Sequence, residues 1–565
     1  MAFDFSAMER RWRRAWESAD CHRAHRRPSA RRYFIHDSAP FPNGPLHMGH
    51  VRTYVLGDIN ARYRRLLGSE VLYHTGFDAF GLPIELEAAE RGLSPSELVR
   101  DSIAAMTEQL RALGISYDWS MVPTTCDPRC YRWTQWLFLE MFDAGLVERR
   151  AAELNWCERC RTTLARLQTE EGRCWRCGEQ VGARRLDQWF VLISKHRDAL
   201  LRGLSGLEGW SSRVKGMLRG LIEDRGGGEA GDWLVSRQRS WGTPIPLVHC
   251  AGCGVVPVPR DALPVVLPED LDWSGAPGAL ARHVGFAATS CPRCGAAARR
   301  ETDTLDCFFD DIWCFLQGLV LSADRPGFTR ENLLRWLPVD LCQSGFDTVA
   351  YFHIYRFLGR FLVERGLIDD PEMIRRFPGS AMVLAGGRKM SKHLGNAVSP
   401  ARILDEFGAD ALRLAIVSAA EPSRDLHWSR APLVRATRLL ERIDGLYGWT
   451  PESAESEADC TRAACRLESV GRRHIAGIAA YIEAHRPHAA IAELDAWCRS
   501  LHRFAARRVP THRLDPADAR LLREQLGRFA VALAPFAPYL AEECWHRLGN
   551  RTLLVSAEWP AEAVA

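Results

Sequence analysis

The stretch YFIHDSAPFPNGPLHMGH, residues 33–50, decides the fold of this 565-residue chain. Its first residues, Tyr33–Ile35, favour a strand, and the Pro, Asn and Gly residues after them predict a turn. A helix is expected to begin at His47 and to run through Tyr63. The next apolar run, Val71–Gly76, predicts a second buried strand. This order of strand, turn, helix and strand indicates a parallel α/β sheet of the nucleotide-binding type.

The predicted helix starts with two histidines in the pattern H-M-G-H. A helix N-terminus favours phosphate because its free backbone N–H groups and its dipole both point outward. Gly49 lets a planar ring or a phosphate approach the backbone, and His47 and His50 can donate hydrogen bonds to a phosphate as it gains charge. The pattern alone is weak evidence, since two helix histidines are most often structural.

A second short motif, K-M-S-K, lies far downstream. Its Lys389 and Lys392 are two of only four lysines among 74 basic residues, and Gly386 and Gly387 precede them. A chain that uses arginine almost everywhere else, but lysine here, favours a compact point charge at this place. A glycine-flanked loop with two lysines is typical of a phosphate clamp. The alternative for K-M-S-K is a pair of charges on a solvated turn. Coincidence is a much weaker explanation when H-M-G-H and K-M-S-K occur in the same chain.

Eight of the 18 cysteines form four C-x-x-C pairs. The first two pairs have the spacing of a zinc ribbon, in which two turns present four thiolates tetrahedrally. A longer loop separates the other two pairs, so a second zinc site is predicted there with free thiols as the alternative. A redox C-x-x-C pair would not need a second pair nearby. The predicted ligands are Cys157, Cys160, Cys174 and Cys177 in the first cluster, and Cys250, Cys253, Cys291 and Cys294 in the second.

Composition and periodicity indicate the domain organisation. With 47% hydrophobic and 25% charged residues the chain is expected to be globular, and its net charge of +4 neither proves nor excludes a nucleic-acid partner. No apolar run has the roughly 18–20 residues of a membrane span, and no signal peptide is visible, so a cytoplasmic location is expected. The expected segments are 1–150 (first half of a Rossmann-type α/β catalytic domain), 151–249 (an insertion with a zinc ribbon and a short linker), 250–300 (a second zinc-binding insertion), 301–430 (second half of the catalytic domain, with the K-M-S-K loop) and 431–565 (an α-helical bundle).

Longer motifs point to a family. Besides H-M-G-H and K-M-S-K, the chain contains GFDAFGLP at Gly76–Pro83 and DWLVSRQRSWGTPIP at Asp232–Pro246. A third segment, ETDTLD, occupies Glu301–Asp306. With these motifs the chain resembles the class I aminoacyl-tRNA synthetases over nearly its whole length, and the leucyl branch most closely. The isoleucyl, valyl and methionyl branches are close relatives.

The resemblance implies a reaction in two steps. An amino acid and ATP, accompanied by Mg²⁺, form an aminoacyl-adenylate, and the acyl group then passes to the terminal ribose of tRNA. By this resemblance His47 and His50 steady the α-phosphate transition state, and Lys389 and Lys392 clamp the triphosphate. It further assigns nucleotide contacts and the shape of the K-M-S-K loop to Gly49, Gly345, Asp347, Met390 and Ser391, and amino-acid contacts to Asp78, Ala39, Phe41, Thr348 and Phe352, with Asp78 on the α-ammonium.

The chain also departs from the leucyl pattern. Residues 223–231 bridge the place where leucyl enzymes carry a large hydrolytic editing domain, and we expect that domain and the family's small C-terminal tRNA-elbow domain to be absent. Ser38 and Ala39 stand where the bacterial leucyl motif has Met and Phe, and Thr348 and Phe352 stand where it has histidines. These altered positions indicate a pocket that fits a different side chain, whereas the resemblance as a whole implies leucine or a similar aliphatic amino acid.

Three functions are compatible with these residues. The first is a leucyl-type aminoacyl-tRNA ligase without a cis editing domain, as an accessory paralogue more readily than a housekeeping enzyme. Its partners would be tRNA, the amino acid and ATP, with no membrane partner, and the relatives suggest a monomer. In the second, the protein transfers the activated amino acid to an acceptor other than tRNA in specialised metabolism. The retained helical domain argues against this function. The third is a catalytically silent tRNA-binding protein, against which the intact histidines and lysines argue.

Overall fold

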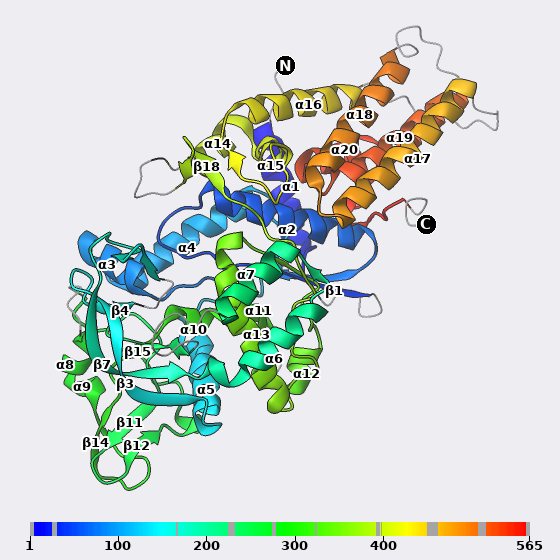
Figure 1. Ribbon diagram of the computed structural model, residues 1–565. Coiled ribbons are helices and arrows are strands. Elements are labelled where there is room, and N and C mark those ends of the chain that lie inside the picture. Colours follow the sequence, from blue (N-terminus) through cyan, green and yellow to red (C-terminus); the bar gives the residue numbers. More distant parts are fainter. Residues whose placement is uncertain are drawn as a thin grey trace.

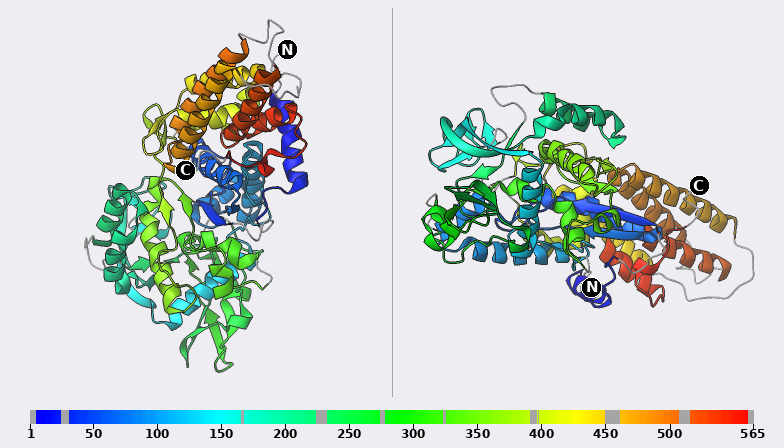
Figure 2. Two further views of the ribbon diagram at one scale, coloured as in Figure 1. Left: turned by 90° about the vertical axis from the view of Figure 1, so that its right-hand side faces the viewer. Right: turned by 90° about the horizontal axis from the view of Figure 1, so that it is seen from below.

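The chain is divided into a central α/β body, a helical bundle at one end and two small β modules at the other (Figures 1 and 2). The computed structural model describes residues 5–24, 31–164, 168–223, 232–273, 278–322, 325–390, 396, 398–448, 461–506 and 516–560. Among the helices of these residues, none has the length and apolar character that crossing a membrane requires. The predicted fold class, a parallel-sheet α/β core with cysteine-bearing insertions and a helical bundle, is confirmed.

The body is built on a three-stranded parallel sheet in the order β16-β1-β2. β1 (Arg32–Asp37) lies in the middle, between β2 (Glu70–His74) and β16 (Leu341–Gln343). In register, Asp37 lies beside Gln343, so that the carboxyl ends of strands from distant parts of the chain meet at one edge. Ligands of open parallel sheets bind beyond this edge.

Helices cover both faces of the sheet. α2 (Met48–Leu66) packs on one face, where the buried Ile35 and Tyr73 point toward it, and α11 (Cys314–Leu321) lies on the other. The remaining helices of the body are α3 (Leu82–Arg91), α4 (Pro95–Ala112), α5 (Pro128–Asp143), α6 (Arg197–Arg202), α7 (Ser212–Glu223), α10 (Cys307–Asp311), α12 (Arg330–Leu334), α13 (Val349–Glu364), α14 (Pro400–Phe407) and α15 (Ala409–Ser418). Two short parallel strands, β8 (Gly209–Trp210) and β17 (Arg376–Phe377), pair with each other beside them.

The two β modules carry the C-x-x-C pairs. In the first, the long β3 (Val147–Cys157) pairs with β7 (Gly182–Val191), and in the second, β11 (Leu247–Cys250) is central. The first module is completed by β4 (Thr162–Leu164), β5 (Thr169–Glu170), β6 (Arg173–Cys174) and β9 (Trp233–Leu234), and the second by β12 (Gly254–Pro257), α8 (Ala279–Arg282), α9 (Val284–Ala287), β13 (Ala288–Ser290) and β14 (Ala297–Arg300). β10 (Ser236–Arg237) and β15 (Thr304–Leu305) pair with each other and join the modules to the body.

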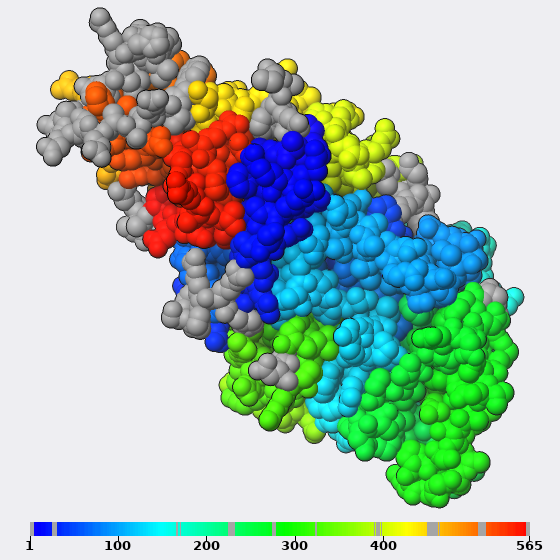
Figure 3. Space-filling view, turned by 180° about the vertical axis from the view of Figure 1, so that it is seen from behind, coloured from blue at the N-terminus to red at the C-terminus, as the bar shows by residue number. Residues whose placement is uncertain are grey.

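The helical bundle is joined to the body by a buried arginine, which also forms an ion pair within the body. Arg413 of α15, fully buried, donates to the carboxylate of Asp58 on α2 at 2.7 Å and to the carbonyl of Pro535 at 2.8 Å. α1 (Phe5–Ala19) lies along the bundle, where Trp16 donates to Glu542, and Figure 3 shows this first helix beside the C-terminal helices. The bundle consists of α16 (Ala431–Tyr447), α17 (Arg462–Glu483), α18 (Pro487–Ala506), α19 (Pro516–Leu533) and α20 (Pro538–Arg547).

Candidate active site

The H-M-G-H motif lies where β1 leads into α2, at the carboxyl edge of the sheet. His47 is the N-cap of α2: its Nδ1 accepts the backbone N–H of His50 at 3.2 Å, and the Nδ1 of His50 accepts the N–H of His47 at 3.3 Å. The two rings stack at 3.6 Å. Because each Nδ1 is an acceptor, each neutral imidazole carries its proton on Nε2. The motif therefore presents two N–H donors beside a helix N-terminus.

Gly49 is required by this arrangement. A Cβ at Gly49 would lie 2.9 Å from Cε1 of His47, closer than such contacts ever are. Any side chain at this position would displace the His47 ring and break the reciprocal cap. The sequence analysis expected the glycine to admit a ligand; the structure shows that it also admits the histidine.

Asp78 lies at the same edge, in the loop that follows β2. Its backbone N–H donates to the carbonyl of Pro40 at 3.2 Å, which places it beside the turn before the H-M-G-H motif. Its Oδ1 is buried and has no hydrogen-bond partner among the described residues. Burial and the neighbouring carboxylates of Asp311 and Asp310 raise the pKa of Asp78 well above its usual range. A positively charged group bound here would lower the free energy of this carboxylate.

The W-G-T-P-I-P segment holds the Asp78 loop in place. The indole N–H of Trp241 donates to the carbonyl of Ala79 at 2.7 Å, and the backbone N–H of Gly81 donates to the carbonyl of Trp241 at 3.1 Å. Glu85 of α3 accepts the backbone N–H of Trp241 at 2.9 Å. Two of the motifs that the sequence analysis singled out separately therefore form one unit around Asp78.

The K-M-S-K motif begins in a β-hairpin. β18 (Val383–Ala385) and β19 (Arg388–Lys389) are joined by Gly386 and Gly387, both with positive φ, as a tight hairpin turn requires. Met390 is buried in the core and anchors the end of the hairpin. β20 (Leu426–His427) runs parallel to β18 on its other side. Ser391, Lys392 and the side chain of Lys389 lie outside the described residues.

Arg52 links the two motif-bearing segments, and the sequence analysis missed it. This arginine of α2 is 1% exposed and donates to the carbonyls of Ala381 (2.8 Å), Glu421 (2.8 Å) and Arg424 (3.0 Å). It thereby fixes the segments that lead into β18 and β20 against the helix that starts with H-M-G-H. The only signal in the sequence is a charged residue among the apolar residues of a helix that must be buried.

The nucleotide contacts expected after β16 also lie at this edge. Gly345 forms a parallel bridge with Ser380, and the carboxylate of Asp347 folds back so closely that a Cβ on Gly345 would lie 2.3 Å from its Oδ1. Thr348 donates to the carbonyl of Gly345 at 2.8 Å and shares a hydrogen bond with Ser344. This loop is thus compact and internally hydrogen-bonded.

The expected pocket residues fall into two groups. Ala39 and Phe41 are half-buried and belong to the turn that also contacts Asp78. Phe352 is instead 1% exposed and packs on Phe377 at 4.3 Å between ring centroids, inside the hydrophobic core. The structure therefore brings Ala39 and Phe41 to the site and places Phe352 behind its wall.

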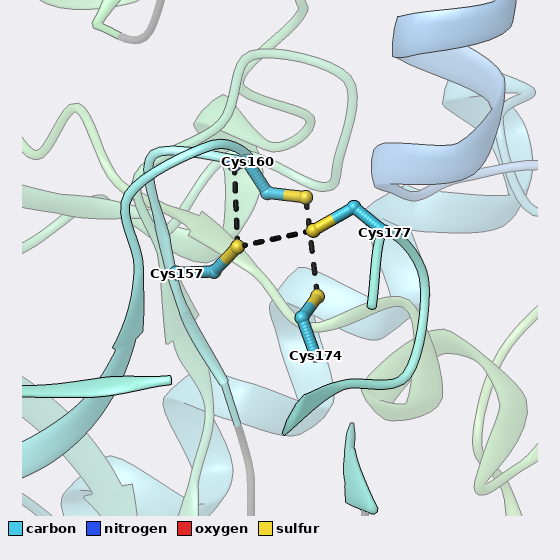
Figure 4. Close-up of side chains that lie close together, drawn as sticks. All are labelled: Cys157, Cys160, Cys174 and Cys177. Carbon is cyan, nitrogen blue, oxygen red and sulfur yellow. Dashed lines mark hydrogen bonds between the residues drawn. The ribbon is translucent and has the colours of Figure 1, made fainter. Parts of the chain in front are cut away.

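Both cysteine clusters are assembled. In the first, the Sγ atoms of Cys157 and Cys177 lie 3.4 Å apart and those of Cys160 and Cys174 lie 3.9 Å apart (Figure 4). In each cluster the four Sγ atoms lie within 4.8 Å of one another. Four thiolates at these separations match a tetrahedral zinc site. The second cluster, from the widely spaced pairs, is Cys250, Cys253, Cys291 and Cys294.

Comparisons with known proteins show the family of the chain. The family profile described as tRNA synthetases class I (I, L, M and V) matches residues 11–429, and that of the anticodon-binding domain of tRNA ligase matches residues 470–565. A leucine–tRNA ligase of Symbiobacterium thermophilum is 31% identical over 99% of this chain and 91% of its own length, and one of Thermotoga maritima is 29% identical over 98% and 90%.

Solved structures are similar as well. The agnB2 LeuRS of Agrobacterium radiobacter K84, in a ternary complex with tRNA and LeuAMS, matches with a TM-score of 0.89 and 25% identity over 99% of this chain and 90% of that one. The methionyl-tRNA synthetase of Mycobacterium tuberculosis matches with a TM-score of 0.68 and 19% identity over 91% of this chain and 93% of that one, a likeness of fold.

Proposed function

This chain belongs to the class I tRNA synthetases of the I, L, M and V type, and from that membership we propose that it activates leucine, or a similar aliphatic amino acid, with ATP and transfers it to tRNA. One observation carries the proposal. The two Nε2–H donors of His47 and His50 and the buried Oδ1 of Asp78, which has no hydrogen-bond partner among the described residues, lie at the same sheet edge. The former suit a phosphate and the latter suits an ammonium. An amino acid and a nucleotide are the substrates that carry these two groups.

We assign the first step to positioning and charge stabilisation. Asp78 binds the α-ammonium and so orients the carboxylate of the amino acid toward the α-phosphate. His47 and His50 donate their Nε2–H groups to that phosphate as negative charge develops. Lys389 and Lys392 bind the triphosphate with its Mg²⁺ and stabilise the departing pyrophosphate. Gly345 and Asp347 lie at the loop that would receive the ribose, with Gly49, Met390 and Ser391 shaping the nucleotide site.

Aliphatic specificity is supported by the walls of the site. Ala39 and Phe41 belong to the turn beside Asp78. The hydroxyl of Thr348 donates its proton to a backbone carbonyl, so that proton is not offered to a substrate. Phe352 supports the wall from the core. With no charged partner for a substrate side chain among these four residues, an apolar side chain is the one they favour.

The two cysteine clusters fit structural zinc. Their thiolates are the soft ligands that Zn²⁺ prefers, and each set of four Sγ atoms is already gathered within 4.8 Å. Zinc bound there would supply folding free energy to its module and no reactive group. The ligands would be Cys157, Cys160, Cys174 and Cys177 in one ribbon, and Cys250, Cys253, Cys291 and Cys294 in the other.

We also propose that the chain lacks a cis editing domain. α7 ends at Glu223 and β9 begins at Trp233, so the connection is too short for a folded domain. The alignment with the Symbiobacterium relative runs over 785 positions, more than the 565 residues of this chain, so that relative carries sequence without a counterpart here. An apolar pocket separates amino acids that differ by one methylene by only about 10- to 200-fold. An enzyme of this limited selectivity suits an accessory role. We further propose that it acts in the cytoplasm as a monomer.

The test is amino-acid-dependent ATP–pyrophosphate exchange over the twenty standard amino acids, without tRNA. We expect exchange with leucine to be strongest and near-isosteric aliphatic amino acids to follow. Exchange with a polar amino acid alone would move the specificity away from the aliphatic class. Silence over the whole panel, with tRNA added as well, would refute amino-acid activation.

A further inference from the structure

The first ribbon exposes an indole ring on the turn of its second cysteine pair. Trp175 lies between Cys174 and Cys177 and is 46% exposed. Among the described residues, it is the one aromatic side chain in the set of strongly exposed large apolar side chains. A tryptophan on a turn with almost half of its surface exposed is suited to stack on a planar partner.

Charged groups beside the indole favour an anionic partner. Trp175 forms part of a surface hollow of about 760 Å³, whose other walls are Glu171, Arg173, Cys174, Arg176 and Gly178. Arg173 is exposed and Arg176 is half-buried, so two guanidinium groups face the hollow against one carboxylate. A ring flanked by guanidinium groups matches the two parts of a nucleotide, since the base stacks on the indole and the phosphate pairs with an arginine.

The ribbon stands next to the candidate active site. Arg176 donates to the carbonyl of Pro83 at 3.5 Å, and Leu82 shares an apolar cluster with Cys157 and Leu164 of the ribbon. Both Leu82 and Pro83 belong to the first turn of α3, which follows the Asp78 loop, and Figure 1 shows the β3–β4–β7 module beside α3. The ribbon is therefore within reach of a polymer that approaches Asp78 along α3.

The indole is not needed to build such a ribbon. Of the four C-x-x-C turns in the chain, the other three carry Glu158-Arg159, Ala251-Gly252 and Pro292-Arg293 between their cysteines, with no aromatic residue. The second cluster nevertheless gathers its four Sγ atoms as closely as the first. The aromatic ring therefore distinguishes the ribbon beside the active site from the one farther away.

We propose that Trp175 is a stacking platform for an unpaired base at the 3′ end of tRNA, with Arg173 on the adjoining phosphate. This inference rests on the proposed function, in which tRNA is the acceptor. The 3′ end is the single-stranded part of tRNA that must reach the sheet edge, and its unstacked bases each have an open face. Stacking on the indole guides the terminal ribose toward the activated carboxyl group without reading the sequence.

The experiment uses the full chain and a tRNA in which 2-aminopurine replaces an unpaired base next to the terminal adenine, because the terminal nucleotide itself is placed at the sheet edge. We expect the 2-aminopurine fluorescence to fall when the tRNA binds the wild-type chain and to recover in Trp175→Ala, with Trp175→Phe in between. The KM for tRNA in aminoacylation should rise about 5- to 150-fold in Trp175→Ala, the equivalent of 1–3 kcal/mol per stacked base. Arg173→Ala should lower the salt dependence of tRNA binding by about one counterion.

The matched control is Arg293→Ala, on the corresponding turn of the second ribbon, which should behave as wild type. Metal analysis of Trp175→Ala must show the wild-type zinc content, which confirms that its ribbon is folded. If the 2-aminopurine signal is the same in Trp175→Ala and wild type, the inference is wrong. It is equally wrong if ATP–pyrophosphate exchange falls as much as tRNA charging, since the hollow would then hold free nucleotide. Failure of the proposed function is distinct, because the wild-type chain itself would then bind no tRNA.

Discussion

Replacing Arg52 with methionine tests whether the H-M-G-H helix and the K-M-S-K hairpin are held together by one buried side chain. Arg52 donates three hydrogen bonds of 3.0 Å or less to the carbonyls of Ala381, Glu421 and Arg424. A hydrogen bond to a charged group contributes about 1.5–3 kcal/mol, and carbonyls that lose it can partly recover water. We therefore expect a loss of roughly 3–5 kcal/mol in the docking of the K-M-S-K hairpin on α2.

This loss should appear in ATP use rather than in global unfolding. If the hairpin must be docked to bind the triphosphate, about 3–5 kcal/mol corresponds to a fall of roughly 150- to 5,000-fold in kcat/KM for ATP in pyrophosphate exchange. Arg52→Lys keeps the charge but not the planar fork, so it should recover only part of the activity.

The matched control is Arg62→Met on the same helix. Arg62 is also buried, but it pairs with Asp58 on the side of α2 that faces the bundle joint. We expect Arg62→Met to lower stability in urea without a selective effect on ATP. The reasoning is refuted if Arg52→Met retains wild-type kcat/KM for ATP, or if both variants lose activity only in proportion to their unfolded fraction.

Three further changes have defined outcomes. Gly49→Ala should lower pyrophosphate exchange by at least tenfold, because its Cβ displaces the capping histidine; an unchanged rate in a folded variant would contradict this. Burial and a neighbouring aspartate raise the pKa of Glu9 to about 8, so unfolding free energy should fall as pH rises from about 4.5 to 8, and Glu9→Gln should flatten that slope in denaturant titrations at several pH values. Metal analysis should show that Cys157→Ser and Cys250→Ser each lose one equivalent of zinc. If neither variant loses zinc, the two clusters are not zinc sites.

The local signals in the sequence predicted the start of the fold well. A helix was expected to begin at His47, and α2 begins at Met48 with His47 as its cap, because Gly49 and the flanking turn determine that start. The strand expected at Val71–Gly76 is β2, Glu70–His74. The two cysteine clusters could be predicted equally well, because the C-x-x-C spacing of their ligands is a local property of the sequence.

Non-local features could not be predicted in the same way. The pairing of β1 with β16 joins strands about 300 residues apart, and no local pattern records it. The role of Arg52 depends on backbone carbonyls, which every residue has, so residue types give no sign of the partners. Phe352 was expected at the pocket by position in a motif, but it packs in the core, because its helix turns that side chain toward Phe377.

The most direct test of the account is the charging of tRNA with labelled amino acid by the purified chain. We predict leucyl-tRNA with leucine, loss of this product in the His47→Ala and His50→Ala variants, and mischarging with near-isosteres within about 10- to 200-fold of leucine. Mischarged tRNA should persist, as the proposed lack of a cis editing domain requires. No charging with leucine, from a chain that binds tRNA and exchanges pyrophosphate, or rapid hydrolysis of the mischarged product, would contradict the account.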